Sequence, residues 1–314
     1  MEKRILFRPI KCKICEDKPV IYLRASNLAL CREHFIERFE KITFEIIKKF
    51  KMFDKNEKVL VACSGGKDSS SLAYILKKLN FNIEGIYINL GIEKGDYSKK
   101  SEEFVKKFSE KFNIKIHIYD LKKEKGRGLD DILKNKKSYK PCSVCGIVKR
   151  YVMNKFAFGK DFNTIATGHN LDDEVSRLFG NIIFWQEGYL IHQNPLLERD
   201  EKLLKKVKPF AFFTEKETAL YAILNEIDYI RDECPYSKDA KTLFYKSLLN
   251  KVEENSPGAK IRFYKGFLEI QKKYFKTVHK KHIEIIGEEK ECKICGMPTT
   301  REICGFCRIF ENES

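Results

Sequence analysis

From about residue 58 onward, the chain alternates short apolar runs with segments whose apolar residues recur at helical spacing, and this alternation constrains the fold more than any other feature. The runs typical of strands are 58–63, 83–90, 114–121 and 162–168, and the helical segments are 70–79, 101–112, 145–158 and 170–184. Strands that alternate with helices favour a parallel sheet covered by helices on both faces. The sequence therefore predicts a doubly wound α/β domain over residues 54–237.

The size and charge of the chain narrow its class. At 314 residues it has room for about two domains of ~150 residues with a sizeable core. Its 61 Lys and Arg against 45 Asp and Glu give a net charge of +16, which favours a polyanionic partner such as nucleic acid. No apolar run approaches the ~20 residues that cross a bilayer, and residues 1–15 lack the long apolar stretch of a signal peptide. We expect a cytoplasmic protein with no membrane partner.

Cysteine and histidine residues cluster near both ends of the chain at the spacing of metal ligands. Two thiolates separated by two residues can turn toward one ion, which is typical of structural zinc sites in a reducing compartment. We predict an N-terminal zinc finger over residues 1–36, a linker helix over 37–53 and a C-terminal zinc ribbon over 288–314. The predicted Zn²⁺ ligands are Cys12, Cys15, Cys31 and His34 in the finger, and Cys292, Cys295, Cys304 and Cys307 in the ribbon.

The segment Ser64–Ser69, SGGKDS, joins the first predicted strand to the helix that follows it. Backbone N–H groups and the positive end of the helix dipole meet at such a junction, so anions bind there readily. Gly65 and Gly66 let the backbone approach phosphate oxygens, Lys67 can neutralise their charge, and Asp68 could hold Mg²⁺. A plain connecting turn would explain the two glycines but not the Lys-Asp-Ser that follows them. We therefore predict a nucleotide-phosphate site.

SGGKDS in this setting resembles the PP-loop of the N-type ATP pyrophosphatases, which cleave ATP to AMP and pyrophosphate and adenylate a substrate. A second segment, Gly168–Glu174 with the sequence GHNLDDE, resembles the GHNxDD segment of the tRNA-thiolating branch. It follows a predicted strand, where open α/β sheets bind their ligands. Asp172 and Asp173 also suit the acidic first turn of a helix, and both interpretations can hold together. Of the two, we expect Asp173 to have a catalytic or Mg²⁺-binding role.

Three cysteines in the middle of the chain form a separate candidate site. Cys142 and Cys145 have CxxC spacing, and Cys234 is a distant third. The residues alone leave three interpretations open: a [4Fe–4S] cluster with one open iron, a redox CxxC pair, or a zinc ion whose fourth ligand folds in from elsewhere.

The order of the motifs over nearly the whole chain resembles the TtuA group of tRNA 2-thiouridine synthetases: zinc module, SGGKDS, PCSVCG, KRY, GHNLDDE, a later CP cysteine and a CxxCGxPT ribbon. The resemblance implies a [4Fe–4S] cluster on Cys142, Cys145 and Cys234, and zinc on the eight terminal ligands. CSVCG and GHNLDD favour the members that act on the TΨC-loop uridine, position 54, over those that thiolate the wobble uridine, position 34. The ATP contacts implied are Ala62, Ser64, Asp68, Ile88, Lys149 and Gly168.

The activity implied is ATP-dependent thiolation of tRNA. Uridine O2, flipped out of its loop, would attack the α-phosphate of ATP, and a sulfur atom would then replace the resulting AMP at C2. Lys67 and Lys149 would stabilise the phosphate charge, with Asp68 on Mg²⁺. The sulfur donor would be sulfide or a ubiquitin-like thiocarboxylate carrier, and the family suggests a homodimer. The alternatives are another tRNA-adenylating enzyme, such as a lysidine-type ligase, and a non-catalytic RNA-binding scaffold.

Two basic segments of the sequence each have two interpretations, and one further cysteine has a single interpretation. Residues 238–287 are predicted to be helical and basic, and the lysine-rich run 271–282 is either a solvated helix face or an RNA contact. The insertion 122–140 is basic, and is either a loop that faces tRNA or a solvated segment. Cys63, which directly precedes the PP-loop, is expected to be a buried core thiol.

Overall fold

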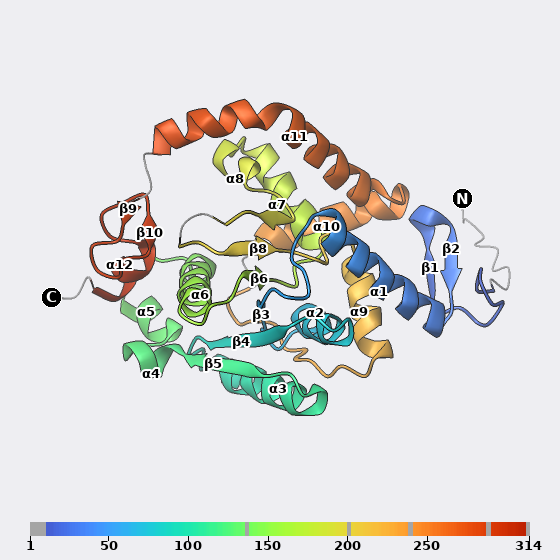
Figure 1. Ribbon diagram of the computed structural model, residues 1–314, viewed down its shortest axis with the longest axis horizontal. Coiled ribbons are helices and arrows are strands. Elements are labelled where there is room, and N and C mark those ends of the chain that lie inside the picture. Colours follow the sequence, from blue (N-terminus) through green and yellow to red (C-terminus); the bar gives the residue numbers. More distant parts are fainter. Residues whose placement is uncertain (1–10, 136–137, 200–201, 238–240, 287–289, 312–314) are drawn as a thin grey trace.

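The computed structural model describes the chain except for residues 1–10, 136–137, 200–201, 238–240, 287–289 and 312–314, and gives residues 275–286 as helical backbone. Its centre is a six-stranded sheet in the order β5-β4-β3-β6-β8-β7 (Figure 1). The strands are β3 (Val59–Ala62), β4 (Ile83–Asn89), β5 (Ile116–Asp120), β6 (Thr164–Ala166), β7 (Leu196–Leu197) and β8 (Lys205–Val207). All neighbouring pairs are parallel except β7 and β8, which are antiparallel. The predicted α/β fold is confirmed, with one antiparallel edge strand added.

Helices cover both faces of the sheet because successive side chains of each strand point to opposite faces. Val59 and Val61 of β3 belong to a core cluster with α1, α2 and α9, whereas Leu60 belongs to a second cluster with α6 and the C-terminal segment. The two clusters lie on opposite faces of the sheet, so helices form a layer on each face, as the alternation in the sequence predicts. The helices of this region are α2 (Lys67–Lys78), α3 (Tyr97–Phe112), α6 (Pro141–Phe158), α7 (Leu171–Ile183), α8 (Glu187–Ile191) and α9 (Glu215–Leu224).

The N-terminal module is a two-stranded hairpin, β1 (Ile21–Leu23) and β2 (Leu28–Leu30), followed by the helix α1 (Arg32–Lys49). Helix α1 starts inside the segment of the finger and continues onto the sheet region. There the ring of Phe39 stacks on Phe213, with centroids 4.0 Å apart, and on Tyr221, at 4.5 Å. The helix is therefore part of the main core, and the division at residues 36 and 53 stays a prediction.

Several elements were not predicted, because their sequence signals are short. Strands β7 and β8 have only two and three residues, and β8 is made mostly of lysine. The basic insertion contains two short helices, α4 (Leu121–Lys125) and α5 (Leu129–Asn135). Since Leu129 and Ile132 of α5 are buried in the core, this part of the insertion is folded against the domain. Single 3-10 turns lie at Arg24–Ser26 and Lys94–Asp96.

The predicted helical segment 238–287 holds α10 (Lys241–Asn255) and α11 (Ala259–Ile286), which pack on α7 through Leu178, Leu249 and Tyr264. Side chains of the basic run beyond residue 274 lie outside the described part. The C-terminal ribbon has β9 (Lys290–Glu291), β10 (Pro298–Thr299) and α12 (Gly305–Glu311), at the end of the molecule opposite the finger (Figure 1). None of the described helices is long and apolar enough to cross a membrane.

Candidate active site

A cavity of about 1050 Å³ lies at the carboxyl ends of β3, β4 and β6. Loops after parallel strands of an open sheet meet at this edge, which is where such folds bind ligands. The cavity brings together segments that are far apart in sequence, from the loop after β3 to the segment after α9. Most of the site residues predicted from the sequence line it: Ala62, Ser64, Asp68, Ser69, Ile88, Cys142, Cys145, Lys149, Gly168, Asp173 and Cys234. Gly65, Gly66 and Lys67 flank it as part of the same loop.

The loop after β3 is shaped by its glycines and by the start of α2. Gly65 has a φ of +80°, a left-handed conformation that suits glycine, and Gly66 caps the helix that begins at Lys67. The backbone N–H of Ser64 donates to Ser69 Oγ at 3.0 Å, which closes the turn. Gly168, after β6, must also be small, because a Cβ there would lie 2.8 Å from backbone atoms of Asp68. The segment after β6 is therefore in direct contact with the first turn of α2 at the predicted phosphate site.

Three carboxylates and two lysines form an ion-pair network beside this loop. Lys67 Nζ lies 2.8 Å from Glu215 Oε1 and 3.1 Å from Asp68 Oδ2. Lys246 Nζ, from α10, lies 2.7 Å from Asp173 Oδ1 and 3.2 Å from Glu215 Oε2. Three carboxylates share two ammonium groups in this network, so it carries one excess negative charge when all five groups are ionised.

The pKa shifts in this network follow from burial and from the ion pairs. Burial raises the pKa of Asp68, and the attraction of Lys67 only partly offsets it. For Asp173 and Glu215 burial has the same upward influence, but Lys246 and the other neighbouring groups outweigh it and lower both pKa values. Asp68 is thus the carboxyl of this group whose charge is held least firmly. Thr218 donates its hydroxyl to Asp68, so the acid is fixed in place as well.

Asp173 lies in the first turn of α7 and also lines the cavity. It completes a capping box at the start of α7, where its N–H donates to the Asn170 side chain at 3.1 Å and its carboxylate accepts from the Asn170 N–H at 3.2 Å. Its side chain also lines the cavity, whereas that of Asp172 does not. Asp172 instead accepts from the N–H of Glu215 at 2.7 Å and pairs with Lys260. The geometry therefore agrees with the preference for Asp173 over Asp172.

Cys142, Cys145 and Cys234 line the same cavity as the PP-loop. The first two lie in the opening turns of α6, and Cys234 lies in the segment after α9. The Cys142 thiol lies 3.6 Å from the carbonyl oxygen of Tyr236, two residues after Cys234, so the start of α6 packs against the segment that carries the third cysteine. Three cysteine donors on one cavity suit a cluster that keeps one iron open. Cys63 is buried, as expected, with its pKa raised to about 12 by burial, and it also contributes to the cavity wall.

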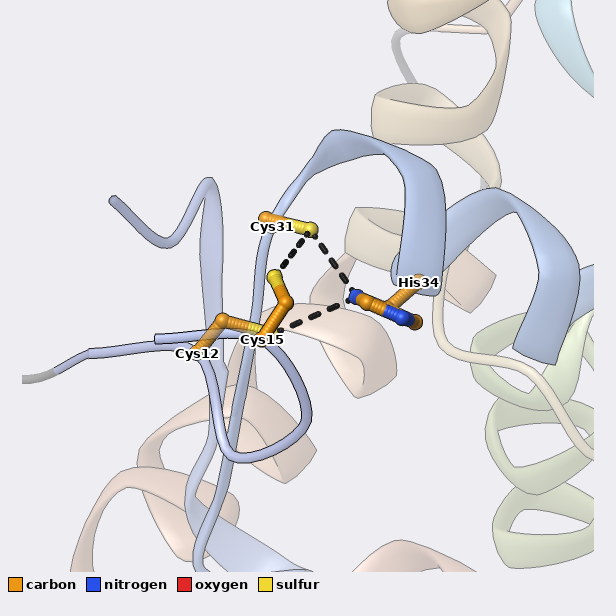
Figure 2. Close-up of side chains that lie close together, drawn as sticks. All are labelled: Cys12, Cys15, Cys31 and His34. Atoms are coloured by element: carbon orange, nitrogen blue, oxygen red, sulfur yellow. Dashed lines mark hydrogen bonds between the residues drawn. The ribbon is translucent and has the colours of Figure 1, made fainter. Parts of the chain in front are cut away.

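The ligand atoms of the two terminal sets lie closer together than the sulfur atoms of the three central cysteines. Among the described residues, Cys12, Cys15, Cys31 and His34, and likewise Cys292, Cys295, Cys304 and Cys307, each have their ligand atoms within 4.8 Å of one another. Figure 2 shows the first set, in which Cys31 Sγ lies 3.2 Å from His34 Nδ1 and 3.6 Å from Cys15 Sγ. Four sulfur or imidazole donors at this spacing fit a tetrahedral structural zinc ion.

Sequence reasoning missed a group of basic residues on another side of the cavity: Arg150, Arg177, Lys206 and Lys208. His169 is linked to them, since Arg177 Nη2 lies 3.0 Å from its Nε2 and Thr167 Oγ1 lies 3.0 Å from its Nδ1. Burial and the charge of Arg177 lower the pKa of His169 to about 3, so the ring is neutral. Arg150 lies in the KRY motif and His169 in GHNLDDE, so both could have been identified as site residues from the sequence. Lys206 and Lys208 could not, because they belong to no motif and β8 was not predicted.

Comparison with known proteins gives a consistent family assignment. Residues 11–36 match the N-terminal LIM domain of 2-thiouridine synthetase TtuA, and residues 33–241 match the PP-loop domain. The tRNA-5-methyluridine(54) 2-sulfurtransferases of Pyrococcus horikoshii and Thermus thermophilus are 44% and 42% identical to the chain, over 96% of its length and 94% and 91% of theirs. The U34-tRNA thiolase NcsA of Methanococcus maripaludis, solved with its [4Fe-4S] cluster, superposes with a TM-score of 0.81 at 28% identity, over 97% of this chain and 96% of that one.

Proposed function

Because this chain belongs to the TtuA family of 2-thiouridine synthetases, with a PP-loop domain, we propose that it is an ATP-dependent tRNA sulfurtransferase that makes 2-thiouridine at position 54. One observation carries the proposal: the PP-loop, Asp173 and the three central cysteines line a single cavity. An activated oxygen and an incoming sulfur can therefore meet. Position 54 is favoured over position 34 because the relatives that act at 54 share more of this sequence than the solved U34 thiolase does.

The PP-loop end of the cavity would bind and activate ATP. The N–H groups at the start of α2 and the ammonium of Lys67 would hold the phosphates, and Lys149 would add charge from the cavity wall. Uridine O2 would attack the α-phosphate, releasing pyrophosphate and leaving O2 joined to AMP. When sulfur then attacks C2, the C2–O2 bond breaks and AMP departs. Asp68 and Asp173 are the residues that would hold Mg²⁺, which would neutralise phosphate charge.

The three central thiolates have a different role. Cys142, Cys145 and Cys234 would hold a [4Fe–4S] cluster, which would supply an open iron site able to carry sulfide. The residues of the chain would position this sulfur source in the cavity by packing the start of α6 against the segment around Cys234, where the Cys142 thiol lies 3.6 Å from the Tyr236 carbonyl oxygen. A lysidine-type ligase uses an amine nucleophile and has no need of these thiolates, so their position favours thiolation.

We also propose two structural zinc ions, a sulfur donor and a dimeric state for this chain. The terminal Cys and His sets would each bind one Zn²⁺, and the sulfur donor would be sulfide or a ubiquitin-like thiocarboxylate carrier. We propose a homodimer that works in the cytoplasm, where its tRNA substrate is modified and its thiols stay reduced.

The test is reconstitution. The chain, purified anaerobically and loaded with iron and sulfide, is given ATP, sulfide and tRNA, and the product nucleosides are mapped by mass spectrometry. We expect 2-thiolation at position 54 with stoichiometric AMP. Cys142→Ala and Cys234→Ala should lose the iron–sulfur absorbance and thiolation together, whereas Cys63→Ala, a buried cysteine outside the three, should keep both.

Three results would count against the proposal. Thiolation at position 34 alone would move the target, full thiolation by Cys142→Ala would remove the cluster role, and tRNA binding without AMP release would indicate a non-catalytic RNA-binding protein.

A further inference from the structure

One side of the cavity carries cations that have no acidic partner. Arg150 on α6, Arg177 on α7 and Lys206 on β8 all line it, and within the described part of the chain none of the three forms an ion pair with a carboxylate. Burial and the neighbouring charge of Arg150 lower the pKa of Lys206 to about 8. Arg150 and Arg177 are exposed and Lys206 is half-buried, so all three present positive charge to the cavity without a carboxylate partner, which favours an anionic ligand.

Each of the three cations is fixed by the element that carries it. In β8 the neighbours Lys205 and Val207 face away, Lys205 onto Glu57 at 3.0 Å and Val207 into the core, which directs Lys206 to the cavity side. Arg177 is oriented by its hydrogen bond to the neutral His169. The Arg150 guanidinium lies over Gly146, 3.2 Å from the position of a Cβ there. The glycine leaves room for it beside Cys145.

The cations beside the PP-loop differ from these three because they have acidic partners. Lys67 and Lys246, the cations near the PP-loop, are both paired with carboxylates of the ion network. ATP phosphates have a site there at the start of α2. The unpaired cations therefore form a second anion site on the same cavity, and the Arg150 guanidinium lies against Gly146, the residue after Cys145.

Exposed aromatic rings lie at the rim of this second site. Phe184 and Tyr189 line the cavity and are 55% and 68% exposed, and Trp185 beside them is 76% exposed. The ammonium of Lys241 lies 5.3 Å from the centroid of the Phe184 ring. Cations combined with exposed rings are the features by which proteins hold unpaired nucleotides, through phosphate contacts and base stacking.

We propose that Arg150, Arg177 and Lys206 bind a backbone phosphate of the tRNA next to the target uridine, while Tyr189 and Phe184 stack on the neighbouring bases. This inference rests on the proposed function, because it takes tRNA as the substrate. The tRNA strand then lies on the side of the cavity between α6, α7 and β8, and the target base extends inward between the PP-loop and the cysteines.

The test measures tRNA binding against salt concentration. Each phosphate contact contributes roughly 0.7–0.9 to the slope of log K against log salt, so Lys206→Gln should lower the slope by about one unit. It should also raise the KM for tRNA about tenfold and leave the KM for ATP unchanged. Lys206→Arg should restore the slope, and Lys77→Gln, an exposed lysine at the far end of α2, is the matched control with no change.

A second variant tests the aromatic rim independently of charge. Tyr189→Ala should weaken tRNA binding about tenfold at constant salt slope, whereas Tyr189→Phe keeps the ring and should bind normally. An unchanged slope for Lys206→Gln, a rise in the KM for ATP, or a defect seen only with a carrier-protein sulfur donor would overturn the inference. Wild-type chain that does not thiolate tRNA would instead refute the proposed function.

Discussion

Lys246 Nζ on α10 lies 2.7 Å from Asp173 Oδ1 on α7, so a helix outside the predicted α/β domain completes the active-site cavity. The sequence predicts only that the segment 238–287 is helical and basic. Its first helix supplies a counter-charge to the carboxylate that we propose for catalysis or Mg²⁺ binding. The interaction is four-fifths shielded from solvent, with 20% and 23% of the two side chains exposed, so it should affect both stability and metal binding.

Replacing this lysine should expose the repulsion between Asp173 and Glu215. Lys246→Gln is expected to lower the free energy of unfolding by about 1 kcal/mol, because it leaves two partly exposed carboxylates with less counter-charge. Mg²⁺ should therefore raise the melting temperature of the variant more than that of the wild type. Lys100→Gln, which breaks an exposed pair with Asp232, should show neither effect. Equal Mg²⁺ shifts in all three proteins would exclude Lys246 as the counter-charge.

The C-terminal ribbon should influence the central cysteines through α6. The ring of Phe306 on α12 stacks on that of Tyr151 on α6, with centroids 3.7 Å apart and planes at 7°. Phe306→Ala should cost ~3 kcal/mol, since the ring is buried. We expect it to lower the fraction of iron–sulfur cluster retained on α6, measured by absorbance after desalting. Retention equal to the wild type at a lower melting temperature would show that the ribbon only stabilises the fold.

Lys206 should lower the free energy of unfolding of the chain at neutral pH, because it must be charged inside the fold to make its proposed contact with tRNA. The folded chain protonates it only below a pKa of about 8, whereas the unfolded chain does so up to the ordinary value of 10.5. The unfolded state therefore binds more protons between these pH values, so stability rises with pH across this window. Lys206→Met should be more stable than the wild type at pH 7, by on the order of 1 kcal/mol.

Denaturant unfolding at pH 7, 9 and 10.5 checks this prediction. The advantage of Lys206→Met should be largest at pH 7 and should be much smaller at pH 10.5, where the lysine is neutral in the folded chain and about half protonated in the unfolded chain. An advantage that stays constant with pH would come from packing rather than from charge.

Gly168 should be essential for the contact between the segment after β6 and the first turn of α2. A Cβ at this position would lie 2.8 Å from backbone atoms of Asp68 and Ser69, which no side-chain movement can relieve. Gly168→Ala is expected to displace the start of α2 and to raise the Kd for ATP at least tenfold, measured by calorimetry. Gly266→Ala on α11 has nothing within 4 Å of the new Cβ and should bind ATP normally while gaining about 0.5–1 kcal/mol of stability. Normal ATP binding by Gly168→Ala would refute the assigned role of this contact.

The sequence by itself determined the features that depend on residues near one another. The alternation of apolar runs and amphipathic segments predicted the parallel strands β3, β4, β5 and β6 and their helices, and the SGGKDS loop follows its strand as expected. Ligand spacing identified the two terminal sets, because a CxxC pair already holds two donors at the distance that one ion requires.

Only the tertiary structure decided which distant residues share the cavity. Lys206 lies on β8, a strand of three residues that is held by pairing with β6 and β7 rather than by any pattern of its own. Lys246 and Cys234 reach the PP-loop from 150 or more residues away, and the direction of a side chain over such a separation depends on how whole elements pack. Local patterns specify which elements form, whereas the packing of those elements sets the charges and donors that face one another.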